Sequence, residues 1–453
     1  MKQINSRYTV LGAGNGGKAM AAHLSIMGFE VTLYNRTPEN IAAIQARGGI
    51  TLESQDPSGP NGFGSLVCVT SNIQEAIENG DIIMVVAPSY AHYDIACNAA
   101  PYLKAGQIVV LNPGRTLGAI EFNRVLNEKG CANGVTVAET QIFIYASRAD
   151  GPAQARIFRI KDAVPLAALP ATDTIMVLEK LASAYPQFID GGDVLQTGLN
   201  NVGAIFHPTI SILNSGWIEA TNGEFQFYLD GVTPTVARLM EVLDRERATV
   251  ASAVGVRAVT ARKWLKMAYN AEGENLHEAI HNQSGYRGIN APSTLTHRYI
   301  TEDIPMSLVP IASLGNRYGV SVRGMESIIR LACIAHRTDY WQRGRTVERL
   351  GIEHLSVSEL TRYVTGKSKH QMPVYSHRPK LTPVSVSRVE KTRLISGRGS
   401  LEKTPLSSIL ICFRNNCANQ LSEWLLFFHL LTRNIVENKN RSTILQLTCF
   451  FIC

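Results

Sequence analysis

A glycine-rich loop close to the start of the chain restricts the fold more than any other feature. An apolar segment over residues 8–11 leads into Gly-Ala-Gly-Asn-Gly-Gly at 12–17, and a helical pattern follows. In this G-x-G-x-x-G spacing the first glycine permits a tight turn, the second lets a pyrophosphate approach, and the third lets the helix pack against the strand. We therefore expect a dinucleotide site at Gly12, Gly14, Asn15, Gly16 and Gly17. The alternative is a loop that needs glycine only for a positive φ.

Short apolar segments alternate with helical patterns through the first half of the chain. Strands are expected at residues 8–11, 31–34, 82–86, 108–111 and 136–138, and helices at 18–27 and 40–47. Strands that alternate with helices indicate βαβ units and a parallel sheet. The sequence thus predicts an α/β fold whose first part, residues 1–190, is a Rossmann-type, doubly wound NAD(P)-binding domain.

From about residue 190 the pattern changes to long helical windows with few strands. One helix is expected to begin at Thr233-Pro234, a capping residue followed by proline at the first helical position, and to end near Gly255. Further helical signals run through residues 325–336 and fade at Gly366. These windows predict an all-α substrate domain at residues 191–366.

The last part of the chain differs in composition from the rest. Residues 367–453 hold 13 Lys and Arg against 4 Glu, whereas the preceding 366 residues carry a net charge of −2. The body of the chain therefore gives no reason to expect a nucleic-acid partner. A Ser-, Pro-, Lys- and Arg-rich segment without periodicity predicts a basic, cysteine-rich and disordered tail. A partner-binding tail and an altered reading frame are alternatives that the sequence leaves open.

The cysteine spacing and the length of the apolar segments indicate the cellular compartment in which the protein is expected. Cys68, Cys97, Cys131 and Cys333 are single and widely spaced, which indicates neither a disulfide framework nor a zinc site. The apolar segment at 424–431 is much shorter than the roughly 20 residues of a membrane span. We therefore expect a cytoplasmic protein that binds no metal and no membrane.

The end of the second expected strand bears on the cofactor. Residues 34–37 read Tyr-Asn-Arg-Thr. A carboxylate here would bind the ribose 2′-hydroxyl of NAD, but none is present, and Arg36 beside Asn35 suits the 2′-phosphate of NADP. We expect NADP, with NAD as the alternative, because an arginine can also stack on adenine or face solvent.

Two segments of the second half combine polar groups that could carry chemistry. The first, residues 200–214, is a helical pattern with a small polar face made of Asn200, Gly203, His207, Ser211 and Asn214. The second, residues 296–305, holds His297, Arg298, Glu302 and Asp303 just before an expected helix start.

A carboxylate can orient and charge a histidine so that it acts as a general acid and base near neutral pH. An arginine can bind a substrate carboxylate through two hydrogen bonds. The alternatives are a structural histidine and an exposed cluster of ion pairs. Spacing alone leaves open whether the two segments meet.

Over residues 6–366 the sequence resembles the octopine/nopaline dehydrogenase (opine dehydrogenase) family. The resemblance rests on the glycine loop, on Asn201 followed by His207-Pro208, and on residues 297–299 followed by 302–305. It implies a Rossmann domain followed by a helical domain, with catalysis between them. It also implies that His207 donates and accepts a proton, that Asp303 orients His207, and that Arg298 and Asn201 bind substrate. Octopine synthase-like members have an asparagine where this chain has Gly203, so the substrate is the least transferable property.

The resemblance further implies an NAD(P)-dependent oxidoreductase that acts on CH–NH groups. It would condense an amino acid with a 2-oxo acid, pyruvate or 2-oxoglutarate, through an imine that NAD(P)H reduces. These two small molecules are the expected partners, and a homodimer is compatible with the sequence. One alternative is a two-domain dehydrogenase that reduces a 2-oxo or 3-hydroxy acid without an amine, and the other is a catalytically inactive NADP-binding protein. The first alternative would oxidise the cofactor with the oxo acid alone, whereas an opine dehydrogenase needs the amine as well. The second alternative would bind NADPH but show no turnover with any substrate pair.

Overall fold

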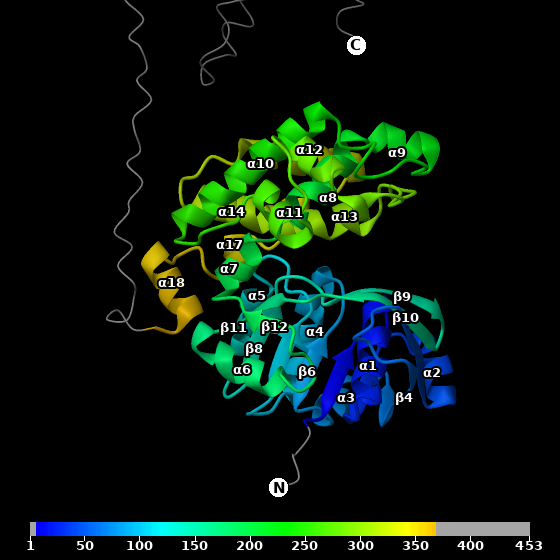
Figure 1. Ribbon diagram of the computed structural model, residues 1–453. Coiled ribbons are helices and arrows are strands. Elements are labelled where there is room, and N and C mark those ends of the chain that lie inside the picture. Colours follow the sequence, from blue (N-terminus) through cyan, green and yellow to red (C-terminus); the bar gives the residue numbers. More distant parts are fainter. Residues whose placement is uncertain (1–5, 368–453) are drawn as a thin grey trace, which may run out of the picture. The chain divides into compact units, whose positions relative to one another are not determined.

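The computed structural model describes residues 6–367 of the 453-residue chain. These residues belong to a single unit by their mutual contacts. A strand-rich first half, drawn from blue to cyan in Figure 1, is followed by a helical second half in green to yellow. The tail predicted at residues 367–453 lies outside the described residues, apart from Lys367.

The main sheet has eight strands in the order β12-β11-β8-β7-β6-β1-β2-β5. They are β1 (Tyr8–Leu11), β2 (Val31–Tyr34), β5 (Cys68–Thr70), β6 (Ile82–Val85), β7 (Ile108–Leu111), β8 (Thr136–Thr140), β11 (Val164–Leu169) and β12 (Phe188–Asp190). Neighbouring strands run parallel except β8 and β11, which are antiparallel. From β5 to β8 this is the doubly wound order 3-2-1-4-5-6, whose ligands bind beyond the carboxyl ends of the strands where β1 and β6 meet. The predicted Rossmann-type fold is confirmed.

Both faces of this sheet are buried, because successive side chains of a strand point to opposite sides. Val10 and Met84 belong to one apolar cluster, and the adjacent Leu11 and Val85 belong to the other. The first cluster includes residues of α1 (Asn15–Ile26), α2 (Ala42–Arg47) and α6 (Thr174–Leu181), and the second includes residues of α3 (Ile73–Glu78), α4 (His92–Ala99) and α5 (Gly118–Glu128). The second cluster continues into the helical half of the chain.

A smaller sheet was not predicted from the sequence. Its order is β4-β3-β10-β9, with β3 (Gly49–Ser54), β4 (Gly62–Ser65), β9 (Tyr145–Gly151) and β10 (Gln154–Ile160). β3 and β4 are inserted between β2 and β5, β9 and β10 form an antiparallel pair after β8, and β10 joins β3 in parallel. Ala155 and Ile157 of β10 are buried in the same cluster as α1. This packing brings β9 close to the glycine loop.

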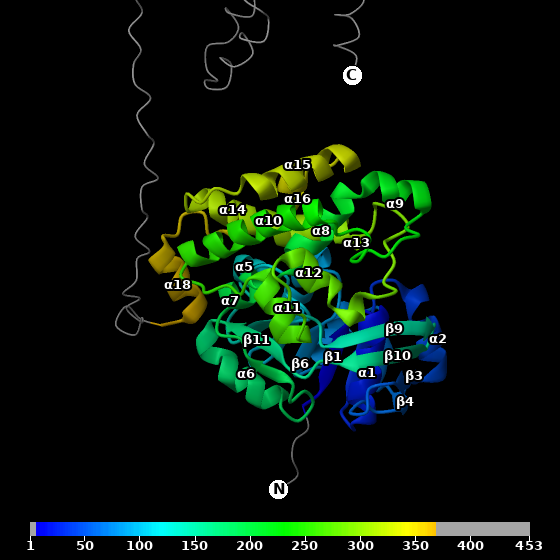
Figure 2. The same cartoon turned by 45° about the horizontal axis from the view of Figure 1, so that its top comes forward.

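After β12 the described chain is mainly helical, and these helices gather on one side of the sheet (Figures 1 and 2). They are α7 (Val194–Leu199), α8 (Gly203–Leu213), α9 (Ser215–Thr221), α10 (Pro234–Ala253), α11 (Ala261–Tyr269), α12 (Leu276–His281), α13 (Arg298–Thr301), α14 (Val309–Arg317), α15 (Arg323–His336), α16 (Tyr340–Arg343), α17 (Val347–Leu350) and α18 (Val357–Thr365). The helix predicted at Thr233-Pro234 is α10, where the Thr233 hydroxyl accepts a hydrogen bond from the Val236 N–H. No helix of the described part is long and apolar enough to cross a membrane.

The helical window predicted over residues 200–214 is wrong at its start. Helix α7 ends at Leu199 and α8 begins at Gly203, so Asn200 and Asn201 lie in the connection between them. The segment at 296–305 contains a short helix of its own, α13, and a π-helical turn η6 (Ile304–Leu308) then leads into α14. The domain limits at residues 190 and 366 stay predictions.

Candidate active site

The glycine loop has the shape that its sequence predicts. Gly12 has φ +119°, and a Cβ atom there would overlap the carbonyl oxygen of Val86. A Cβ on Gly17 would overlap the carbonyl oxygen of Gly12, so neither position tolerates a side chain. At Gly14, by contrast, nothing lies within 4 Å of the Cβ position. The loop therefore leaves open space at the start of α1, where the helix N-terminus favours a phosphate.

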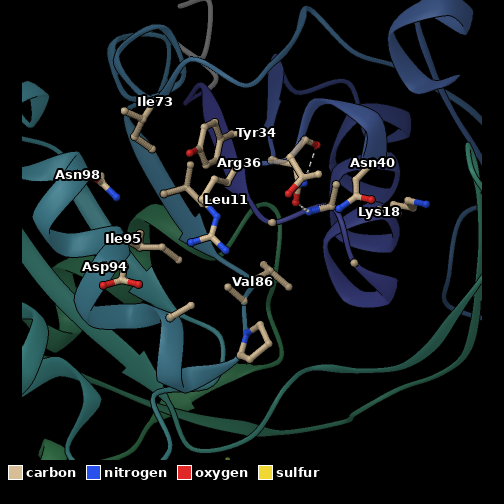
Figure 3. Close-up of a pocket in the computed structure, with 18 of the residues that line it drawn as sticks. Leu11, Lys18, Tyr34, Arg36, Asn40, Ile73, Val86, Asp94, Ile95 and Asn98 are labelled. Atoms are coloured by element: carbon tan, nitrogen blue, oxygen red, sulfur yellow. Dashed lines mark hydrogen bonds between the residues drawn. The ribbon is translucent and has the colours of Figure 1, made fainter. Parts of the chain in front are cut away.

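A cavity of about 630 Å³ lies beside this loop. Figure 3 shows Arg36 pointing into it from the end of β2, with Asp94, Ile95 and Asn98 of α4 across from it. Asn35 also lines the cavity, and its side chain bridges the Ala13 N–H and the Thr37 carbonyl at 3.3 and 3.0 Å. The residues present thus fit a dinucleotide: a glycine cradle for the pyrophosphate and a cation near the expected ribose position.

A second cavity, of about 810 Å³, adjoins the first through Gly14, Val86, Ala87 and Pro88. Its wall carries residues from both halves of the chain. They are Gly14, Asn15, Gly16, Val86, Ala87, Pro88, Asn112, Pro113, Arg115, Phe143, Tyr145, Ala146, Ser147, Arg148, Phe158, His207, His297, Arg298 and Tyr299. Three arginines and two histidines are among them, and none of the described lining residues is acidic.

The two polar segments of the second half meet at this cavity. His207, on α8, lies with its Nδ1 atom 2.8 Å from Oδ2 of Asp303, which follows α13 and is fully buried. The ring is stacked on Tyr299 with centroids 4.2 Å apart, and Nε2 lies 3.2 Å from the Tyr228 hydroxyl. Asp303 therefore holds one nitrogen of the ring and the aromatic neighbours fix its plane, so Nε2 is the ring nitrogen that has no carboxylate partner.

Arg115 is a site residue that sequence reasoning missed. It follows β7 with φ +60° and lies 3.2 Å from Asp303 and 3.6 Å from Glu302. Burial by itself raises the pKa of Glu302, but the charges of Arg115 and Arg298 outweigh it and lower that pKa to about 2. The Ser89 N–H and hydroxyl also donate to Glu302 at 2.9 and 2.8 Å. A charged residue just beyond the carboxyl end of a parallel strand was the signal that could have revealed Arg115.

Arg298, which the resemblance implied would bind substrate, lines the cavity but is already ion-paired. Its Nη2 atom lies 2.7 Å from Oε2 of Glu302, and half of its side chain is exposed. This leaves further N–H donors of the guanidinium for a ligand, because an arginine carries five.

Asn201 is placed differently from the expectation. It is buried, does not belong to the cavity lining, and donates to the Ser307 hydroxyl at 2.9 Å. A Cβ atom on Gly203 would lie 3.3 Å from the Asn201 side-chain oxygen and 3.5 Å from Cε1 of His207. Octopine synthase-like members have an asparagine at the position of Gly203, and the side-chain amide of Asn201 borders the space that this asparagine would occupy.

A buried arginine connects the loops around the site. Arg345 donates to Glu121 at 2.7 Å, to the Gly114 carbonyl at 2.9 Å and to the Ser89 carbonyl at 3.0 Å. It comes from the helical half, whereas its partners belong to the Rossmann half. Arg345 therefore ties the helical half to the two loops that carry Arg115 and Ser89. Among the residues described, no group of three or more His, Cys, Asp or Glu is arranged to hold a metal ion.

Comparison with known proteins places this arrangement in a family. The alpha-helical domain of NAD/NADP octopine/nopaline dehydrogenases matches residues 191–336, and the N-terminus of NAD-dependent glycerol-3-phosphate dehydrogenases matches residues 7–114. The opine dehydrogenase of Arthrobacter sp. (strain 1C) is 37% identical over 351 residues, which cover 78% of this chain and 96% of that protein. This chain belongs to the opine dehydrogenase family. The vitopine synthase of Allorhizobium ampelinum is 24% identical over 353 residues, or 77% of this chain and 96% of the synthase.

Solved structures agree on the fold of the family. Octopine dehydrogenase with NADH and L-arginine aligns with a TM-score of 0.68 at 19% identity, covering 81% of this chain and all of that one. Yersinopine dehydrogenase with NADP⁺ aligns with a TM-score of 0.61 at 15% identity, covering 78% and 95%. The chain is thus an oxidoreductase of this family with an NAD(P)-binding domain, as its sequence resemblance implied.

Proposed function

We propose that this enzyme condenses an amino acid with a 2-oxo acid, pyruvate or 2-oxoglutarate, and reduces the resulting imine with NADPH. The observation that carries the proposal is the His207–Asp303 pair, whose histidine lines a cavity that adjoins the glycine-loop cavity. A reacting pair bound there would lie between the general acid–base group and the expected dinucleotide. The membership of the chain in the opine dehydrogenase family supports this reading.

The proposed roles follow from the contacts. When bound, the nicotinamide cofactor supplies the hydride that reduces the imine carbon. His207 accepts a proton from the ammonium group of the amino acid, so that the free amine can attack the carbonyl carbon of the oxo acid. The oxygen of the resulting carbinolamine takes one proton from the attacking nitrogen, and His207 then returns its proton to that hydroxyl, which leaves as water while the C=N bond forms. Asp303 stabilises the charged ring between these two steps, and Arg298 binds a substrate carboxylate through its remaining donors.

NADP as the preferred cofactor rests on the end of β2. Arg36 points into the first cavity (Figure 3). Asn35, at the end of β2, is the residue that stands where an NAD-specific domain would have a carboxylate. Among the solved relatives, octopine dehydrogenase carries NADH and yersinopine dehydrogenase carries NADP⁺. Membership of the family therefore does not decide the cofactor, and the proposal of NADP rests on the residues of this chain.

The lining of the second cavity also bears on the amino acid. Its described residues include no Asp or Glu, and the two nearby carboxylates, Glu302 and Asp303, are already paired with Arg115. A guanidinium or ammonium side chain would enter without a partner, whereas Phe143, Phe158 and Tyr299 offer apolar surface. We therefore propose an amino acid with an uncharged side chain, unlike the L-arginine bound by octopine dehydrogenase.

The deciding experiment measures nicotinamide oxidation by the purified full chain. NADPH or NADH is combined with pyruvate or 2-oxoglutarate and with separate pools of apolar, polar, acidic and basic amino acids. We expect oxidation only when both an amino acid and an oxo acid are present, fastest with the apolar pool. Oxidation with the oxo acid alone would instead establish a dehydrogenase without an amine substrate. Cofactor binding without turnover for any pair would establish an inactive binding protein.

A further inference from the structure

Arg148 places a third arginine at the active-site cavity. It belongs to β9 of the smaller sheet and lines the cavity together with His207, His297 and Tyr299. Burial is the first cause of a lowered pKa for His297, and the charges of Arg298 and Arg148 add to it. The charge of Arg148 also opposes the rise in pKa that burial causes at Tyr299. Arg148 therefore acts on the helical wall of the cavity, across from its own strand.

The neighbours of Arg148 do not neutralise it. Its cross-strand partner is Arg156 on β10, and directly opposed like charges destabilise a sheet. Arg156 is compensated by Glu53 and Asp150, each 3.0 Å away. No carboxylate of the described residues lies within salt-bridge distance of Arg148. Of these two paired arginines only Arg148 lines the cavity, and its charge has no carboxylate partner among the described residues.

The proposed reaction supplies the missing anions. An amino acid and a 2-oxo acid each bring a carboxylate, and both carboxylates survive in the secondary-amine product. Arg115 is mostly buried and is paired with both Glu302 and Asp303. Arg298 is half exposed and keeps donors beyond its pair with Glu302, and Arg148 has no carboxylate partner among the described residues, so these two arginines of the lining remain for the two carboxylates. We propose that Arg148 binds one of these carboxylates and Arg298 the other, so that the substrate pair is held between the smaller sheet and the helical half. This inference rests on the proposed function.

The competing anion is the cofactor pyrophosphate. The next residue, Ala149, donates its N–H to the side chain of Asn15 at the start of α1, so the phosphate site is close. The carboxylate is favoured because Arg148 lines the cavity of His207, His297 and Tyr299 and does not belong to the lining of the first cavity, where Arg36 and the glycine loop lie.

The test compares Arg148→Met, Arg148→Lys and the matched control Arg156→Met, which removes the same charge from the same face of the sheet outside the cavity. KM is measured separately for the amino acid, the oxo acid and NADPH, together with kcat. We expect Arg148→Met to raise KM for one carboxylate substrate about ten- to a hundredfold, with KM for NADPH within twofold of the wild type. Arg148→Lys recovers part of the loss, and Arg156→Met behaves like the wild type.

A second measurement does not depend on turnover. Iminodiacetate, the smallest secondary-amine dicarboxylate, is titrated calorimetrically into each variant in the presence of NADP⁺. We expect binding to the wild type and to Arg156→Met and at least tenfold weaker binding to Arg148→Met, whose melting temperature should equal or exceed that of the wild type. Binding with this pattern but without turnover would sink the proposed reaction and leave the carboxylate anchor standing.

Several outcomes would overturn the role of Arg148. A rise in KM for NADPH with unchanged substrate KM values would assign Arg148 to the pyrophosphate. Equal kinetics and equal iminodiacetate affinity in the wild type and Arg148→Met, or no iminodiacetate binding by the wild type, would remove the anchor altogether. A lower melting temperature for Arg148→Met with unchanged KM values would show that the residue is structural.

Discussion

The Nδ1 atom of His207 lies 2.8 Å from the Oδ2 atom of Asp303, although 96 residues separate them in the chain. Asp303 is fully buried and also lies 3.2 Å from Arg115, whereas His207 remains partly exposed at the cavity. The carboxylate is thus held on two sides and presents a fixed acceptor to the imidazole. Such an arrangement selects one tautomer and one orientation of the ring.

His207→Asn and Asp303→Asn should both lower kcat by about 10²- to 10⁴-fold, the usual contribution of general acid–base catalysis. The double variant should lose little more than the worse single variant, because the two residues act as one unit. Dissociation constants for NADPH should not change. His354→Asn, an exposed histidine away from the cavity, is the control. Steady-state rates near those of the wild type for either single variant would contradict the proposed pair.

Arg36→Gln should raise KM for NADPH about tenfold or more and leave KM for NADH nearly unchanged. A 2′-phosphate loses a charge-assisted partner in this variant, whereas a 2′-hydroxyl loses none. Arg245→Gln, at an exposed position on α10, controls for the loss of a positive charge. An equal effect on both cofactors would mean that Arg36 contacts the adenine or the pyrophosphate and does not confer the preference.

Arg345→Met should lower the free energy of unfolding by about 3–5 kcal/mol, the usual result of breaking a buried ion pair by removing one partner. Glu121 would keep only the partly exposed Arg349, and the carbonyls of Gly114 and Ser89 would lose their donor. Urea unfolding followed by circular dichroism measures the change. Arg330→Met, on the exposed side of α15, should cost less than about 0.5 kcal/mol. Similar values for the two variants would show that the Arg345 network does not stabilise the protein.

His23 should make the fold sensitive to acid. Burial lowers the pKa of its imidazole to about 4, whereas in the unfolded chain it titrates near 6.5. Between these values the unfolded chain binds the extra proton, so stability is present above pH 6.5 and is lost as the pH falls towards 4. His92, whose pKa burial lowers to about 3, acts in the same direction.

Glu139 acts in the opposite direction, because burial raises its pKa to about 7 and its contribution is lost as the pH rises from about 4.5 to 7. The comparison of wild type with His23→Gln isolates the histidine. As the pH falls from 6.5 to 4, the free energy of unfolding should decrease in both proteins. The decrease should be about 3 kcal/mol smaller in His23→Gln than in the wild type. Parallel stability curves for the two proteins over this range would refute the assignment.

Much of the architecture could be predicted from local patterns. Buried strands such as β1 and β2 read as short apolar runs, and α10 begins at Pro234 because the preceding Thr233 caps the helix. The smaller sheet was missed because β4 is a mostly exposed strand that contains two glycines, and β10 alternates irregularly around a bulge. Pairing of β10 with β3, about 100 residues earlier, has no local signature.

The amino-acid order was enough for the glycine loop and the doubly wound sheet, because glycine spacing and apolar periodicity are written in contiguous segments. It also marked His207, Arg298 and Asp303 as candidates, whose roles stay predictions. It was not enough for Arg115, Arg148 and Arg345. Their roles arise from partners in distant segments: Asp303 for Arg115, the helical wall for Arg148 and Glu121 for Arg345. A charge acquires a function when folding removes it from water and selects its partner. That selection depends on which sheet edge, loop and helix pack together, and so it belongs to the folded molecule.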